Sequence, residues 1–397
     1  MRALFAIAAL LLAPQASALE TTTSLLFQSE GRLISDSKAN PGNRVARLPA
    51  RLVQVEGRVD ANYTLPWLEI VARPRVEAGF YWVNGVFENS AVGFLQEAYL
   101  RAPLTEDISL TAGRLQFGWG PAESVSPSNW MVPEIQWQAS PYFEQLGVYR
   151  GQASLSAGQD FNLILIHEFQ PLPDRLDSRA EVIPESYRKR ALAKAEWSWV
   201  NGNYILGFTG GRERLQPGEL WRAGGYGSIT ISDAWQIYAD GVARETATSW
   251  KSFSVLGVRY TAESGAEFRF EGIHRGEGLT REERAAQAQV FSLASDSVLA
   301  SILAAQYERL PGREYAYAAF RWVNPPFLPG NFQTPILFLR ALHSLSDHST
   351  SFLGGVEVGF LGHFSTTLYG AMATGPTSGE LKNLYDGMFG VAGKVTF

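Results

Sequence analysis

The chain has 397 residues, of which 46% are hydrophobic and 18% are charged, and it contains no Cys. Its mild formal net charge of −5 argues against a nucleic-acid partner. Without Cys the chain forms no disulfides, and after residue 18 no apolar run reaches the roughly 18 residues that a membrane helix needs.

The first 18 residues have the pattern of a secretory signal peptide. Arg2 precedes an apolar run over residues 3–13. Ala-Ser-Ala at 16–18 fits the pattern of a signal-peptide cleavage site, which has small residues at its first and third positions. We therefore expect cleavage after Ala18 and a single domain over residues 19–397.

Alternation of polar and apolar residues is the main structural signal after the signal peptide. In residues 266–275, for example, Glu267, Arg269 and Glu271 alternate with Phe268 and Phe270. Membrane β-barrels repeat such segments, with apolar side chains toward lipid and polar side chains toward the lumen. The strands must close into a barrel, because the bilayer core holds no water to hydrogen-bond the backbone groups of a free sheet edge.

The pattern recurs often enough to predict about 18 strands. The predicted strands are 22–31, 51–64, 67–82, 93–103, 107–119, 146–156, 160–169, 190–200, 203–211, 221–231, 234–244, 251–262, 266–275, 313–323, 334–345, 350–361, 364–374 and 386–397. Both ends of such a barrel lie on the periplasmic side, so the number is even, and about 14 or 16 strands stay open as alternatives.

Tight turns, such as 65–66 and 201–202, alternate with longer gaps along the chain. The longer gaps are 32–50, 83–92, 118–145, 170–189, 212–220 and 275–312. Because outer-membrane barrels have short periplasmic turns and long extracellular loops, this alternation assigns the two sides. The long extracellular loops are 120–145 and 276–312. The Ala- and Leu-rich stretch 282–307 predicts a helical insertion, although 296–309 could form a strand and break the even number.

The last ten residues alternate and end on Phe397. Here the chain resembles bacterial outer-membrane β-barrels of Gram-negative cells, and at the level of architecture it is similar to alginate-export-type barrels. The stretch Gly113-Arg114 … Trp119-Gly120 also resembles a signature of uncharacterised porin-like families. The resemblance implies an all-β, transmembrane, antiparallel up-and-down β-barrel in the outer membrane, in contact with its lipids. It also implies that the barrel-assembly machinery reads Phe397.

Charged residues recur on the inward phase of the predicted strands. The candidates for pore lining and selectivity are Arg58, Arg73, Arg75, Arg101, Arg114, Gln116, Arg150, Arg269, Arg275, Glu77 and Glu271. A slight excess of Arg would favour anionic solutes, because its planar fork binds carboxylates and phosphates. The structural alternative is that these charges pair across strands and hold the lumen in shape.

The strand 107–119 ends in an aromatic stretch that predicts a special loop. We expect Arg114 and Gln116 to face the lumen and Trp119 to face lipid, and Gly120-Pro121 ends strand pairing because Pro donates no backbone hydrogen bond. The residues predicted to narrow the pore are Trp130, Trp137, Tyr142 and Phe143. The alternative is that the loop packs on the barrel rim.

Catalytic chemistry has little support, since the chain has five His and no Cys. The string Asp347-His348-Ser349 is most simply a polar turn, and His167 beside Glu168 has no third metal ligand. We therefore expect no catalytic, cofactor-binding or metal site, no cofactor, and no enzyme.

About 16 to 18 strands leave an aqueous channel unless loops or a partner fill it. The sequence therefore predicts a porin-like channel that passes small polar solutes, anionic ones among them. The alternatives are an exporter of an anionic polysaccharide and a structural or interaction barrel closed by its loops. Formation of a homo-oligomer is a further alternative. The outward aromatic side chains would suit either a lipid girdle or a subunit contact, as for Trp197, Trp199, Phe268 and Phe270.

Overall fold

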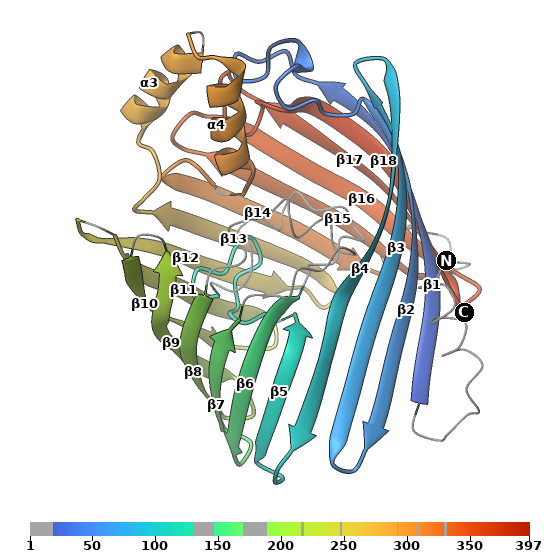
Figure 1. Ribbon diagram of the computed structural model, residues 1–397, viewed down its shortest axis with the longest axis vertical. Coiled ribbons are helices and arrows are strands. Elements are labelled where there is room, and N and C mark those ends of the chain that lie inside the picture. The colour runs from blue at the N-terminus through green and yellow to red at the C-terminus, as the bar shows by residue number, and fades with distance from the viewer. Residues whose placement is uncertain are drawn as a thin grey trace.

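The computed structural model describes residues 19–116, 118–129, 147–169, 189–215, 218–246, 248–291, 293–308, 310–328 and 332–397. Within these ranges eighteen antiparallel strands form one sheet. Each strand pairs with its neighbours in sequence, and β1 also pairs with β18, so the sheet closes into a barrel (Figure 1). The predicted all-β, up-and-down barrel is confirmed.

The strands are β1 (Leu19–Ile34), β2 (Arg51–Leu65), β3 (Leu68–Val83), β4 (Val86–Pro103), β5 (Ile108–Leu115), β6 (Val148–Ala157), β7 (Phe161–Glu168), β8 (Lys189–Trp199), β9 (Tyr204–Leu215), β10 (Gly218–Thr230), β11 (Trp235–Glu245), β12 (Trp250–Thr261), β13 (Ala266–Arg275), β14 (Glu314–Val323), β15 (Gln333–Ser344), β16 (Thr350–Phe360), β17 (Phe364–Thr374) and β18 (Tyr385–Thr396). A short 3-10 helix, η1 (Pro41–Asn43), lies between β1 and β2.

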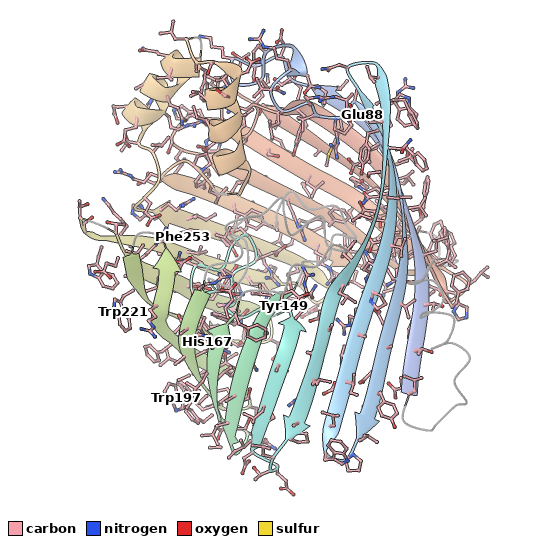
Figure 2. All side chains as sticks on the ribbon, in the orientation of Figure 1. Glu88, Tyr149, His167, Trp197, Trp221 and Phe253 are labelled. Atoms are coloured by element: carbon pink, nitrogen blue, oxygen red, sulfur yellow. The ribbon has the colours of Figure 1, made fainter. Side chains whose placement is uncertain are left out.

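The two faces of each strand differ as the alternation predicts. In β13, Glu271 and Arg275 are buried inside the barrel, whereas Phe270 on the alternate phase is exposed. Trp197 of β8 and Trp221 of β10 are exposed on the outer surface (Figure 2). Successive side chains of a strand point to opposite faces, so the polar phase lines the interior and the apolar phase faces outward.

A row of aromatic rings follows the outward face near the short turns. Trp235 packs on Tyr260 with ring centroids 4.7 Å apart, and Phe268 packs on Phe320 at 4.9 Å. Trp322 continues the row beside Phe320. Such rings form the girdles of membrane barrels at the membrane–water interface. The row therefore marks a boundary of the membrane at the end of the barrel that carries the short turns.

Two of the predicted gaps are shorter than expected. Residues Asn84 and Gly85 alone connect β3 to β4, and both have positive φ, 49° and 81°. Asn-Gly is the preferred pair for such a two-residue hairpin turn. The expected long gap at 83–92 is therefore wrong, since β4 begins at Val86. Strands β9 and β10 likewise extend into the expected gap at 212–220.

The long connection between β13 and β14 contains α3 (Arg281–Phe291) and α4 (Asp296–Glu308), so the predicted helical insertion is confirmed. The helices stand at the loop end of the barrel (Figure 1). Phe291, Leu299 and Leu303 form an apolar cluster with Ala39 of the β1–β2 loop. Neither described helix is long and apolar enough to cross a membrane.

Candidate functional site in the barrel lumen

The chain enters the interior of the barrel after β5. We call residues 118–129 the inner loop; in Figure 1 this segment lies within the ring of strands. Trp119 is buried in an apolar cluster on the inward faces of β7, β8 and β10. The cluster contains Trp119, Ile164, Ile166, Leu192 and Tyr226. The expectation that Trp119 faces lipid is wrong, because β5 ends at Leu115 and the alternation does not continue beyond it.

The inner loop also packs on the other side of the lumen. Val125 joins an apolar cluster that includes inward residues of β11 to β15. The strand residues of this cluster are Val242, Phe253, Val255, Ile273, Tyr315, Tyr317 and Leu342. Between Trp119 and Val125 the loop thus reaches from β7 and β8 to β11 and β13. Residues 118–129 therefore cross the lumen, whereas the rest of the predicted loop lies outside the described residues.

Asp240 of β11 is the first polar anchor of the inner loop. Its carboxylate accepts hydrogen bonds from Ser126 Oγ at 2.6 Å and from the Ser128 backbone N–H at 2.7 Å. Gly120 has a φ of +89°, and a Cβ there would overlap both the Asp240 carboxylate and Ser126 Oγ. The close approach therefore requires glycine at this position.

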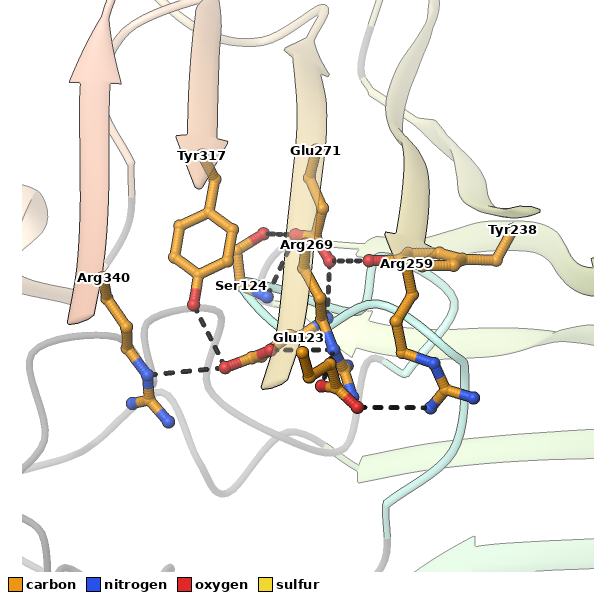
Figure 3. Close-up of polar contacts among 9 residues, drawn as sticks. Glu123, Ser124, Tyr238, Arg259, Arg269, Glu271, Tyr317 and Arg340 are labelled. Atoms are coloured by element: carbon orange, nitrogen blue, oxygen red, sulfur yellow. Dashed lines mark hydrogen bonds and ion pairs between the residues drawn. The ribbon is translucent and has the colours of Figure 1, made fainter. Parts of the chain in front are cut away.

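Glu271 of β13 is the second polar anchor (Figure 3). Its carboxylate accepts hydrogen bonds from the backbone N–H groups of Glu123 at 2.7 Å and Ser124 at 3.1 Å. The Ser124 hydroxyl also donates to it, as does Tyr238 Oη at 2.7 Å. Since a carboxylate has about four acceptor positions, this set of donors satisfies Glu271 fully. Its neighbours indicate a role in holding the loop.

The Glu123 side chain connects the inner loop to cationic groups of the wall. Its carboxylate lies 3.2 Å from Arg269 Nε and 3.4 Å from Arg340 Nε, and it accepts a hydrogen bond from Tyr317 Oη at 3.2 Å (Figure 3). Hydrogen bonds between charged partners are about twice as strong as neutral ones. Glu123 therefore fixes the loop beside a cluster of guanidinium groups.

These guanidinium groups form an inward row on four neighbouring strands, which we call the arginine row. The row consists of Arg259 (β12), Arg269 (β13), Arg321 (β14) and Arg340 (β15). Arg259 lies opposite Arg269 in the sheet register, and Glu267 lies opposite Arg321. Among the residues that the structure describes, two carboxylates, Glu123 and Glu267, pair with the row, so its guanidinium groups outnumber their carboxylate partners there.

Several members of the arginine row are accessible to solvent. The side chains of Arg259 and Arg340 are 34% and 37% exposed. The predicted candidates Arg73 and Arg101 are accessible as well, at 39% and 54%. Accessible guanidinium groups on the inward phase can meet a solute in the lumen.

Most of the other predicted pore-lining residues are buried among protein partners. The buried candidates are Arg58, Arg75, Glu77, Arg114, Arg150, Glu271 and Arg275. Arg75 pairs with Asp60 at 2.8 Å, Arg114 Nε donates to the Gly147 carbonyl, and Arg150 Nη2 donates to the Gln116 carbonyl. These contacts support the structural alternative for this part of the set. The predicted constriction residues Trp130, Trp137, Tyr142 and Phe143 lie outside the described residues.

Asp240, the first anchor of the inner loop, and Arg340 are absent from the predicted site, whereas Glu271 was predicted to line the pore and not to anchor a loop. Arg340 had a usable signal, since it is the only charged residue of the apolar strand Gln333–Ser344. Asp240 and Glu271 lay on the inward phase, yet their partners lie more than a hundred residues earlier in the chain. No local pattern identifies such a contact.

The strings considered for catalysis have structural partners. Asp347 accepts hydrogen bonds from Ser349 N at 2.9 Å and Ser349 Oγ at 2.6 Å, and it pairs with Arg284 at 3.1 Å. Burial of Asp347 would raise its pKa, but the Ser349 and backbone donors hold that pKa below its ordinary value. His167 is on the exposed phase of β7, whereas Glu168 is buried against Arg190, so the two cannot bind one metal.

No family model and no curated protein matches the sequence, whereas solved structures match it. Wzi, an Escherichia coli outer-membrane protein described as a carbohydrate-binding β-barrel in group 1 capsule assembly, matches with TM-score 0.56 and 8% identity, over 99% of this chain and 87% of its own. Pseudomonas aeruginosa OccK2 (OpdF) matches with TM-score 0.53 and 12% identity, over 95% and 98%. A BenF-like porin from Pseudomonas fluorescens Pf-5 matches with TM-score 0.54 and 10% identity, over 96% and 98%. At these identities the likeness shows the fold, and the chain shares the closed β-barrel of these bacterial outer-membrane porins and of Wzi.

Proposed function

We propose that this barrel is a channel for small polar solutes and that it favours anions over cations. The observation that carries the proposal is the arginine row beside a loop that crosses the lumen. Rings of charged side chains at a narrow point of a pore select ions by sign. Arg is suited to carboxylate and phosphate groups because its planar fork binds them through two hydrogen bonds.

The inner loop favours small solutes over a polymer. A loop held at Asp240 and Glu271, and packed on both sides of the lumen, narrows the path that an exported polysaccharide would need. The pore radius can be measured from the size of polyethylene glycol that still enters the pore and lowers its conductance. If polyethylene glycol large enough to fill a barrel that lacks an inner loop still enters the pore, the polysaccharide exporter would be favoured instead.

Reversal potentials in planar bilayers test the selectivity. In a gradient of KCl, the wild-type barrel should favour chloride, and the double variant Arg321→Glu/Arg340→Glu should move the reversal potential toward the potassium value. Arg51→Glu is the matched control, because Arg51 is an exposed Arg on the outward phase of β2. An unchanged potential in the double variant would rule out the arginine row as the selector.

A barrel closed by its loops is the second candidate function. It is supported by the inner loop and by the two helices at the extracellular end. A purified barrel that inserts into bilayers and gives no conductance steps would overturn the channel proposal. That result would favour the closed barrel, with a role in binding.

A further inference from the structure

A groove of about 740 Å³ lies on the outer surface of the barrel, across the outward residues of β9 to β14. These strands are neighbours in the sheet, and β9 to β12 are on the left of Figure 1. Leu206, Phe208 and Leu256 line the groove with exposed apolar side chains. Since the outward surface of a membrane barrel faces the bilayer, either lipid or protein must fill this groove.

Small residues make up the floor of the groove. Gly225 lies opposite Gly241 in the sheet register, Gly241 lies opposite Ser254, and Gly272 follows on β13. A Cβ at Gly272 would meet no atom within 4 Å, so the barrel itself does not require glycine there. Glycine within a strand weakens it and often marks a place where another backbone approaches closely. The floor therefore indicates a close neighbour outside the chain.

A polar pair lies beside this floor. His274 is opposite Ser254 on one side and opposite Glu314 on the other, and all three are on the outward phase. His274 Nδ1 is 3.8 Å from Glu314 Oε1, and the two side chains are 46% and 55% exposed. Because this distance is longer than a hydrogen bond, the imidazole and the carboxylate do not satisfy each other.

The polar pair lies at the depth of the membrane. Along β13 six residues separate His274 from Phe268 of the aromatic row, and along β14 six separate Glu314 from Phe320. At about 3.3 Å per residue and a strand tilt of about 40°, the pair is about 15 Å from the row along the membrane normal. The apolar band of such barrels is about 25 Å tall, and ionisable groups that face lipid are costly. The pair therefore needs a polar partner that shields it from lipid.

A second copy of this chain supplies such a partner. In a two-fold interface the same surface is used twice, so that residue i contacts j and j contacts i. An axis beside the pair brings the imidazole of His274 in each copy to the carboxylate of Glu314 in the other. An acyl chain has no donor or acceptor, so lipid would fill the apolar floor and leave the pair unmatched. Leu256 beside the groove can enter the glycine floor of the opposite copy, because small residues let backbones approach closely.

We propose that this groove is a two-fold interface between two copies of the chain, in which His274 pairs with Glu314 of the second copy and the glycine floor receives the opposing wall. The contact surface is on the outside of the barrel and does not involve the inner loop or the arginine row. The dimer is therefore independent of the proposed channel function and goes beyond it.

Resonance energy transfer between labelled barrels in proteoliposomes tests the interface. The chain contains no Cys, so Ser264→Cys, in the short turn between β12 and β13, provides one position for a donor or an acceptor dye. Transfer in the wild type should rise linearly with the acceptor fraction, as a dimer requires, at protein-to-lipid ratios where chance proximity gives none. Wild-type barrels that stay monomeric under these conditions would overturn the second copy and leave the groove to lipid.

Two charge variants test the pairing across the axis. His274→Glu alone and Glu314→Lys alone each remove the complementary pair from the interface, and each should weaken the dimer at least about tenfold. When the two variants are mixed, they should form a heterodimer of nearly wild-type affinity, because each charge then meets its opposite in the other copy. Within each variant chain the two residues stay mismatched, so mixing cannot restore a pair that acts inside one chain. A mixture that does not associate would exclude His274 and Glu314 from the interface.

Gly272→Leu fills the groove without changing the pair and should abolish the transfer. Gly151→Leu is the matched control, because Gly151 is an outward glycine of β6 outside the groove, where a Cβ likewise meets no atom within 4 Å. It should dimerise like the wild type. Heat-modifiable mobility in gels shows that each variant has folded. Equal transfer in Gly272→Leu and the wild type, or equal loss in both glycine variants, would overturn the interface.

Discussion

Gly120 is the residue on which the position of the inner loop depends most directly. Its φ of +89° is one that side chains rarely adopt, and a Cβ would overlap the Asp240 carboxylate and Ser126 Oγ. These two groups form the 2.6 Å hydrogen bond that fixes the loop to β11. A single methyl group at this position therefore competes with the anchor itself.

Gly120→Ala should release the inner loop and raise the single-channel conductance, with more frequent fluctuations between current levels. Gly118→Ala is the matched control two residues earlier. A Cβ at Gly118 would meet open space, so its conductance should equal that of the wild type. If the two variants conduct alike, the close approach at Gly120 does not set the width of the pore.

Glu271 supports a second prediction at the same scale. Glu271→Gln replaces one acceptor oxygen by an N–H₂ group that faces N–H and O–H donors of the loop. Unpaired buried donors destabilise by about 1–3 kcal/mol, so hydrogen exchange of residues 118–129 should accelerate. Glu267→Gln, on the same face of β13 but partly exposed, should leave this exchange unchanged. Slow exchange in both variants would contradict the anchoring role.

The elements at the loop end of the barrel meet at a buried cluster of charges. Arg284 of α3 pairs with Asp347 of the β15–β16 loop, and the backbone N–H of Glu380 in the β17–β18 loop donates to Asp347 at 2.7 Å. Burial raises the pKa of the Glu380 carboxyl above its ordinary value of 4.5, and the nearby Asp347 charge raises it further. Arg284 and the hydroxyls of Ser344 and Tyr315 oppose this rise.

The packing of these elements should depend on pH. Glu380 has a raised pKa, so its contribution is full below pH 4.5 and is lost as pH rises through the raised value. Asp347 has a lowered pKa, so its contribution is present above pH 3.8 and is lost as pH falls through the lowered value. Packing should therefore be tightest in mild acid, between the two titrations.

Hydrogen exchange of residues 375–384 and 281–291 measures this dependence. Exchange, corrected for its intrinsic pH dependence, should increase as Glu380 ionises. Glu380→Gln should remove that increase, because a neutral amide does not titrate. Glu357→Gln, an inward carboxylate of β16 away from the cluster, is the control and should keep the wild-type profile. A Glu380→Gln profile identical to that of the wild type would exclude Glu380 as the titrating group.

Local patterns predicted the strands well and the loops less well. The predicted ranges 266–275 and 364–374 coincide with β13 and β17, because alternation and turn residues are both visible within ten positions. The turn at Asn84-Gly85 was visible as a sequence pair, but the polar residues of early β4 obscured it. Trp119 was predicted to face lipid because it continues the alternation of β5. The chain leaves the sheet after Leu115, and Trp119 points into the barrel instead.

At the scale of the whole molecule, the sheet closes on itself through β1 and β18. Within the described residues β5 pairs with β4 only from Ala98 to Pro103, so the earlier part of β4 has no strand on that side. Phe397 contributes little to this closure. Its backbone N–H donates to the Thr23 carbonyl at 2.8 Å, while its ring is 75% exposed. The ring is therefore available to another molecule.

Phe397→Ala should slow assembly by the barrel-assembly machinery and leave the stability of the folded barrel nearly unchanged. The rate at which heat-modifiable barrel appears in proteoliposomes with the machinery measures assembly, and urea unfolding measures stability. Phe389→Ala removes a similarly exposed ring from the same strand and should not slow assembly. Equal assembly rates in the wild type, Phe397→Ala and Phe389→Ala would show that the machinery does not recognise the terminal ring.

The anchors of the inner loop impose an order on folding. Asp240 and Glu271 follow their loop partners by 112 to 148 residues, so the loop is made long before the strands that hold it. Contacts between such distant segments form late, because the chain between them must first be ordered. Closure of the barrel pairs Ser24 with Thr396, which are still farther apart in the chain, so the same reasoning places closure after the loop has docked. The inner loop therefore occupies the lumen before the last strands complete the wall.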